Sequence, residues 1–81
     1  MAKNPPSIDL HGYTVEEAQV ALDDFLNKNS NRSKLRVVTG KGSGKVKKAV
    51  LSYLKLANYP WSYEKLKNGA NNEGVLIIHN D

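Results

Sequence analysis

The stretch from Val37 to Val50, VVTGKGSGKVKKAV, joins an apolar run to a lysine-rich segment through three alternating glycines. Its β-branched start predicts a strand over Leu35–Thr39. Its glycines predict a loop from Gly40 to Gly44, and the apolar residues that follow recur at helical spacing. A strand that turns through glycines into a helix N-terminus is typical of α/β folds and of phosphate-binding loops.

The residues before this stretch predict a short strand and a helix. Ser7–Leu10 alternates polar and apolar side chains, which is typical of a strand with one buried face. Thr14 and Glu17 fit a capping box, in which the threonine accepts a backbone N–H and the glutamate reaches back. Apolar residues then recur at helical spacing, so we expect this helix to run to about Asn29.

The residues after the loop predict one helix and two strands. The helix begins near Lys45 and ends before Pro60, since the residue that precedes a proline avoids helical geometry. Tyr63–Lys67 is typical of an exposed edge strand, Gly69–Glu73 of a turn-rich loop, and Gly74–His79 of a strand that is apolar on both faces. The last strand therefore belongs in the middle of the sheet.

The predicted order of elements is strand, helix, strand, helix, strand, strand. Two right-handed crossovers between neighbouring parallel strands leave both helices on one face of the sheet. The sequence therefore predicts an α/β fold, a two-layer sandwich of a four-stranded mixed sheet and two helices. With 81 residues, we expect a single domain over residues 1–81, with a core over about 7–79.

Charge is distributed unevenly along the chain, whose net charge is +4. Residues 1–27 carry one lysine against five acidic residues, whereas residues 28–67 carry eleven lysines and arginines against Glu64 alone. The basic middle predicts a surface that faces a polyanion, nucleic acid first, with solubility as the alternative. The chain has no cysteine, and its longest apolar run, Val75–Ile78, is too short to cross a membrane. We expect a cytoplasmic protein with no membrane partner.

Three short motifs resemble those of a known family. Ile8-Asp9-Leu10-His11-Gly12 resembles the LDLHG motif of the small MutS-related (Smr) domain, with isoleucine in place of the first leucine. Thr39-Gly40-Lys41-Gly42 is similar to the family's second motif, which is HGxG in many members and TGxG in others. Asn71-Asn72-Glu73-Gly74 stands at the family's glycine-rich turn, where only Gly74 matches. Because asparagine tolerates left-handed backbone, we expect this turn to keep its shape.

The resemblance implies a fold and a choice of functions. The family fold, related to the C-terminal domain of translation initiation factor three, implies strand order 1-2-4-3 with an antiparallel fourth strand. Smr domains bind nucleic acid, and some nick DNA or cleave RNA, including messenger RNA at stalled ribosomes. We therefore expect a monomeric nucleic-acid-binding domain, with a nicking endonuclease acting on DNA or RNA as the favoured function. The alternative is a non-catalytic module that anchors a larger protein to nucleic acid or to the ribosome.

The glycine-rich loop is the predicted phosphate site. Its glycines let backbone N–H groups approach an anion, and the helix that follows adds its positive end. The loop is no Walker motif, because only three residues separate Gly40 from Gly44-Lys45, and Val46 follows. A plain strand-to-helix turn is the alternative. The residues predicted to bind phosphate or nucleic acid are Thr39, Gly40, Lys41, Gly42, Ser43, Gly44, Lys45 and Lys48.

Asp9 and His11 are the predicted catalytic residues. Side chains two apart on a strand point the same way, and Thr39 ends the parallel neighbour, so we expect the three to converge. His11 could transfer a proton in phosphodiester cleavage, while Asp9 orients it or binds a divalent cation such as magnesium or manganese. Alternatively, Asp9 fixes the turn and His11 packs on the loop. His79 is expected at the opposite edge, and no histidine or cysteine cluster predicts a metal site.

Basic side chains outside the loop are further candidates for nucleic-acid contact. Lys34 and Arg36 share a strand face that could follow a nucleic-acid backbone if that side of the sheet is open. Lys47 and Lys48, in the second predicted helix, are the stronger candidates.

Overall fold

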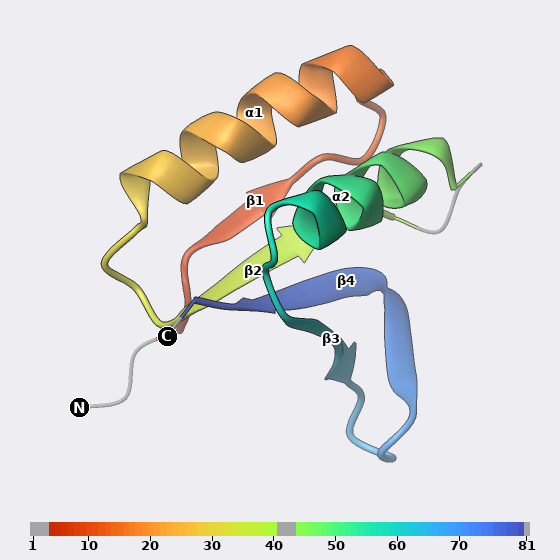
Figure 1. Ribbon diagram of the computed structural model, residues 1–81. Helices are drawn as coiled ribbons and strands as arrows, with labels where there is room; N and C mark the ends of the chain where they lie inside the picture. Colours follow the sequence, from red (N-terminus) through yellow and green to blue (C-terminus); the bar gives the residue numbers. More distant parts are fainter. Residues whose placement is uncertain (1–3, 41–43, 81) are drawn as a thin grey trace.

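The computed structural model describes residues 4–40 and 44–80, which form two helices and a four-stranded sheet. The elements are, in chain order, β1 (Ser7–Asp9), α1 (Val15–Lys28), β2 (Lys34–Val38), α2 (Lys45–Leu56), β3 (Trp61–Lys65) and β4 (Asn71–His79). The strand order is β1-β2-β4-β3, with β1 parallel to β2 and β4 antiparallel to both its neighbours. Both helices cover the same face of the sheet (Figure 1). The predicted fold class and strand order are confirmed.

The core lies between the sheet and the helices. β2 shows the alternation that builds it, because Leu35 and Val37 are fully buried while Lys34 and Arg36 lie on the other face. The buried cluster consists of Leu10, Ala18, Leu22, Leu26, Leu35, Val37, Val50, Leu54, Leu76 and Ile78. This burial specifies the register of the strands, since a slip by one residue would move the apolar set to the solvent face.

Helix α1 begins with the predicted capping box. The Thr14 hydroxyl accepts the Glu17 backbone N–H at 3.1 Å, and the Glu17 carboxylate accepts the Thr14 backbone N–H at 2.9 Å. The helix ends at Lys28, one residue before the expected Asn29, which serves as its C-cap. Within residues 4–40 and 44–80, neither helix is long and apolar enough to span a membrane.

The last two strands form a longer hairpin than the sequence predicts. β3 begins at Trp61 and β4 at Asn71, so both begin earlier than expected. The predicted loop over residues 69–73 is wrong in its second half, because Asn71 pairs with Lys65 across the hairpin. Asparagine has a low strand propensity, but backbone pairing to a partner strand outweighs it here.

The asparagines near Gly74 do not form the left-handed turn that was expected. Asn71 and Asn72 lie in β4, and neither has a positive φ. Among the described residues, the one non-glycine residue with positive φ is Asn58, at 61°, just after the end of α2. Asparagine does take left-handed backbone in this chain, but at the end of a helix.

A bulge bends β4 where the hairpin leaves the sheet. Tyr63 pairs with Leu76, but the next residue of β3, Glu64, pairs with Asn72. Residues 73–75 therefore have no partner in β3, and the strand turns sharply at this point (Figure 1). The bulge lies beside the carboxyl end of β2, where Val38 pairs with Val75.

Candidate functional site

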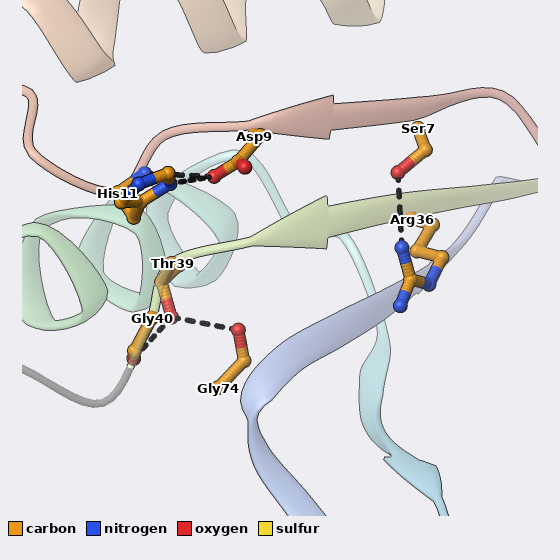
Figure 2. A network of polar contacts seen from close by, with 7 residues as sticks. All are labelled: Ser7, Asp9, His11, Arg36, Thr39, Gly40 and Gly74. Atoms are coloured by element: carbon orange, nitrogen blue, oxygen red, sulfur yellow. Dashed lines mark hydrogen bonds and ion pairs between the residues drawn. The ribbon is translucent and has the colours of Figure 1, made fainter.

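Asp9 and His11 form a hydrogen-bonded pair at the carboxyl end of β1. One oxygen of Asp9, Oδ1, accepts the His11 backbone N–H at 3.0 Å and lies 2.7 Å from His11 Nδ1 (Figure 2). The two side chains are exposed, His11 by 72% and Asp9 by 55%. The two predicted interpretations of Asp9 are therefore compatible, because one oxygen both fixes the turn and holds the imidazole.

The hydrogen bond to Asp9 fixes which nitrogen of the neutral His11 ring carries the proton. The hydrogen bond from the His11 side chain, and after it the one from the His11 backbone, lower the pKa of Asp9 below its ordinary 3.8. Asp9 is therefore ionised at neutral pH, and an ionised carboxylate can only accept hydrogen bonds. In the neutral ring the hydrogen must lie on Nδ1, which leaves Nε2 as a proton acceptor.

Gly40 brings the glycine-rich loop against His11. Its φ is +81°, and a Cβ added there would lie 3.1 Å from the Cβ of His11. A backbone hydrogen bond of 2.7 Å from Leu10 N to Val38 O holds the ends of β1 and β2 together just before this contact. The segment that follows β2 therefore passes directly beside the imidazole, and glycine is the residue that permits it.

The Thr39 side chain was predicted to lie beside Asp9 and His11, but it does not. It is only 7% exposed, and its hydroxyl lies 3.4 Å from the carbonyl oxygens of both Gly40 and Gly74, away from the Asp9–His11 pair (Figure 2). The reason is the neighbouring bulge of β4, whose Gly74 carbonyl offers a buried hydroxyl the acceptor that it needs.

The carbonyl of Gly74 holds the start of the loop, a role that was not predicted. It accepts the backbone N–H groups of Thr39 at 2.8 Å and Gly40 at 3.1 Å. Asn72 Oδ1 in turn accepts the Gly74 N–H at 3.2 Å. The N–H groups of Thr39 and Gly40 are therefore used inside the protein, so these two predicted phosphate ligands position the loop. In the sequence, the only hint of this role was that Gly74 matches the family's third motif.

The remaining predicted phosphate contacts lie at the start of α2. Lys41, Gly42 and Ser43 fall outside the described residues. Gly44 is the N-cap of α2, with φ of +83° and open space around the position of a Cβ. Lys45 and Lys48 lie in the exposed first turn, which has no acidic residue. The helix dipole and the lysines of this first turn together favour an anion at this point.

The other basic candidates differ in availability. Lys48 is exposed, and no partner for it is found among residues 4–40 and 44–80. Lys47 is only 22% exposed, because its Nζ lies 4.7 Å from the ring centre of Tyr63 and 3.7 Å from the Glu73 carboxylate. Hydrogen bonding to Tyr63, with smaller support from Glu73, raises the pKa of Lys47. Lys48 thus fits the prediction better than Lys47.

Arg36 is also occupied within the protein. Its guanidinium pairs with Glu64 at 2.6 Å and lies 3.3 Å from the Ser7 hydroxyl. Because β4 lies between β2 and β3, this ion pair spans the open face of the sheet. The predicted track of basic side chains along that face is therefore interrupted at Arg36.

The described residues bring together too few ligands for a metal centre. Asp9 and His11 are neighbours, but no group of three histidine, cysteine or acidic side chains occurs within residues 4–40 and 44–80. His79 pairs in register with Lys34, at the far end of β2 from the Asp9–His11 pair, as predicted. Its Nε2 lies 3.0 Å from the Ser62 hydroxyl.

A family comparison covers the part of the chain that holds this site. The family model of the Smr domain matches residues 8–80, which include both the Asp9–His11 pair and the start of α2. The chain belongs to the Smr domain family.

Relatives include much longer proteins. This Smr domain is 38% identical over 69 residues to Endonuclease MutS2 of Staphylococcus saprophyticus subsp. saprophyticus, a match that covers 83% of the chain but 8% of the relative. It is 34% identical over 73 residues to Endonuclease MutS2 of Fusobacterium nucleatum subsp. nucleatum, covering 88% of the chain and 9% of the relative. The chain thus spans less than a tenth of these proteins.

Solved Smr domains share the fold. The crystal structure of the Smr domain of Thermus thermophilus MutS2 has a TM-score of 0.76 and 29% identity, covering 91% of this chain and 95% of that one. The human small-MutS related domain gives 0.74 and 32%, with 90% and 97% covered. These are whole-domain matches, so the relatives' larger size comes from regions outside the Smr domain.

Proposed function

We propose that this Smr domain binds nucleic acid at the rim formed by the Asp9–His11 pair and the start of α2, and that it nicks phosphodiester bonds of DNA or RNA. The observation that carries the proposal is the exposed imidazole, held at 2.7 Å by an ionised carboxylate and packed beside Gly40. In this proposal, a proton acceptor and a helix end that attracts phosphate act on the same strand.

The chemistry assigns a separate task to each part of the rim. Nε2 of His11 removes a proton from the attacking hydroxyl, which is water for DNA or the 2′-hydroxyl for RNA, and Asp9 keeps the ring in the required tautomer. The attacking oxygen bonds to phosphorus while the bond to the leaving sugar oxygen breaks. The amides at the start of α2 and the Lys48 charge stabilise the negative charge that builds on the phosphate oxygens. The leaving oxygen takes its proton from the imidazolium or from water.

The relatives support this proposal by their names. MutS2 proteins that share this domain are named endonucleases, and their Smr regions match the chain over most of its length. A divalent cation would meet a single carboxylate here, that of Asp9, so no step of the proposed reaction is assigned to a metal.

A second candidate function is a non-catalytic module that anchors a larger protein to nucleic acid or to the ribosome. It is favoured by the small share of the MutS2 relatives that the chain covers. The hydrogen bond from the His11 N–H to Asp9 also fits it, because that bond stabilises the turn whether or not the ring reacts.

Cleavage assays separate the two candidates. The 81-residue chain is incubated with supercoiled plasmid and with single-stranded RNA, with and without chelator. We expect His11→Ala to lower the cleavage rate by about 10²–10⁴-fold while affinity is retained, since general base catalysis typically contributes that much. Asp9→Asn should lower the rate and keep the fold.

His79→Ala is the matched control, because it removes the same side chain at the far end of β2 and should leave cleavage unchanged. A 2′,3′-cyclic phosphate on the RNA product would identify the 2′-hydroxyl as the attacking group. A parent that binds but does not cut, or a His11→Ala variant that cuts like the parent, would leave the anchoring function as the answer.

A further inference from the structure

The β3–β4 hairpin extends past the carboxyl end of β2. β2 ends where Val38 pairs with Val75, but β4 begins four residues earlier, at Asn71. The first part of β4 therefore extends past the carboxyl end of β2 and is paired only with β3. Figure 1 shows the hairpin bending away from the sheet at the end where the chain leaves β2. The hairpin and the start of α2 thus flank one end of the domain.

The bulge joins the hairpin to the loop that follows β2. Gly74, in the bulge, accepts the N–H groups of Thr39 and Gly40, and Asn72 accepts the Gly74 N–H. These hydrogen bonds hold the base of the hairpin and the start of the loop in one relative position. A ligand that reaches both would meet a preformed surface.

The tip of the hairpin carries two exposed lysines, while Glu73 at its base keeps an exposed carboxylate. The acidic residues of the hairpin are paired with the body of the domain, Glu64 with Arg36 at 2.6 Å and Glu73 with Lys47 at 3.7 Å. Lys65 and Lys67 are exposed, and the Lys65 ammonium donates to a neutral group, the Asn71 amide oxygen, at 2.6 Å. Two exposed lysines therefore lie beyond the paired acids, toward the tip of the hairpin.

The tip of the hairpin is ordered and carries an apolar side chain. Leu66 N donates to Ala70 O at 2.8 Å, Gly69 N donates to Leu66 O at 2.9 Å, and Gly69 takes the left-handed φ of +86°. Asn68 Oδ1 accepts the Ala70 N–H at 3.0 Å. Leu66 stays 44% exposed between the two lysines. Leu66 is therefore accessible to a bound strand.

We propose that the hairpin of residues 64–72 is a second nucleic-acid contact that selects substrates with unpaired bases beside the cleaved bond. Lys65 and Lys67 bind phosphates of the strand that continues from the start of α2, and Leu66 packs on the faces of its unpaired bases. Alternating charge and flat apolar surface is the chemistry of a single strand, whereas a duplex hides its base faces. This inference rests on the proposed nucleic-acid binding.

Binding assays on the 81-residue chain test it. The variant Lys65→Ala/Lys67→Ala is compared with Lys28→Ala/Lys55→Ala, which removes the same charge from the last turns of α1 and α2. Affinity for fluorescent single-stranded oligonucleotides of increasing length is measured by anisotropy across a salt series. We expect the hairpin variant to reduce the salt slope by about 0.7 for each lost phosphate contact, while the control stays near the parent.

Oligonucleotide length and strandedness sharpen the test. The shortest oligonucleotides, which fill only the start of α2, should bind the hairpin variant and the parent equally, and the difference should grow with length. Leu66→Ala should weaken binding to single strands and leave duplex binding unchanged. Unfolding midpoints of the hairpin variants should match that of the parent, because Lys65, Leu66 and Lys67 are exposed.

The failures are distinguishable. If the hairpin and control variants weaken binding equally at every length, the hairpin contact is wrong, even where Lys48→Ala still shows that the start of α2 binds. If Leu66→Ala affects duplex and single strand alike, selection of unpaired bases is wrong. If the parent binds no nucleic acid at all, the proposed function and this inference both fall.

Discussion

The two helices of this Smr domain begin in opposite ways. Thr14 and Glu17 close the start of α1 with a reciprocal capping box, and Glu16 adds a second negative charge to its first turn. The start of α2 has Gly44, which has no side chain to cap with, and a first turn that is basic. The start of α1 is neutralised by the protein's own carboxylates, whereas the first turn of α2 carries lysines and no acidic residue.

The two helix starts differ in how much they stabilise the fold. A capping side chain typically contributes about 1 kcal/mol, and acidic residues in the first turn add roughly 0.3–1 kcal/mol. α2 lacks both contributions, and its lysines oppose its dipole. Departures from good local design are expected at functional sites, so the start of α2 agrees with the proposed phosphate contact.

The largest loss of stability is expected for Gly40→Ala, in the segment that leads to α2. A left-handed alanine costs about 1–2 kcal/mol, and its Cβ would also lie 3.1 Å from the Cβ of His11. We expect denaturant unfolding to show a loss above that of strain alone, together with slower cleavage.

Gly69→Ala is the control for Gly40→Ala, since it has the same left-handed φ but no atom within 4 Å of the added Cβ. The difference between the two variants in unfolding free energy isolates the contact with His11. Equal losses would mean that the loop moves freely away from the imidazole.

The next effect is expected at the capped helix. Thr14→Ala removes the hydroxyl that accepts the Glu17 N–H, so the free energy of unfolding should fall by about 1 kcal/mol. Nucleic-acid affinity at matched salt should stay the same, because this helix start is already satisfied by the protein. A drop in affinity as large as that of Lys48→Ala would contradict the contrast between the two helices.

The smallest change in stability separates binding from folding at α2. Lys48→Glu places an acid near the start of the helix, so it should raise unfolding free energy by roughly 0.3–1 kcal/mol while weakening nucleic-acid binding. Lys55→Glu makes the same charge change in the last turn, where it should lower stability and change affinity much less. If both variants lose affinity equally, binding follows net charge and not the start of α2.

Local patterns predicted the elements well. The capping box at Thr14, the alternation in β2 and the apolar stripe of α2 follow from contacts within one turn or one strand, and the structure has all three. The pairing of Asp9 with His11 was equally accessible, since side chains two apart on a strand share a face.

Errors arose wherever a residue's partner is distant in the chain. Arg36 and Lys47 were expected to face nucleic acid, but they pair with Glu64 and Glu73. The Thr39 hydroxyl was expected beside His11, but it turns to the bulge at Gly74. Each partner lies 26 to 35 residues away, so no local pattern could reveal it.

The amino-acid sequence by itself determined the order of helices and strands, which faces are apolar, and the capping box that begins the first helix. These properties depend on neighbours within a few residues, whose geometry the backbone sets. Only the tertiary structure decided which charges remain free, because an ion pair or a buried hydroxyl depends on where the bulge of β4 meets the end of β2. The extended hairpin and the loop held by the Gly74 carbonyl belong to this second class.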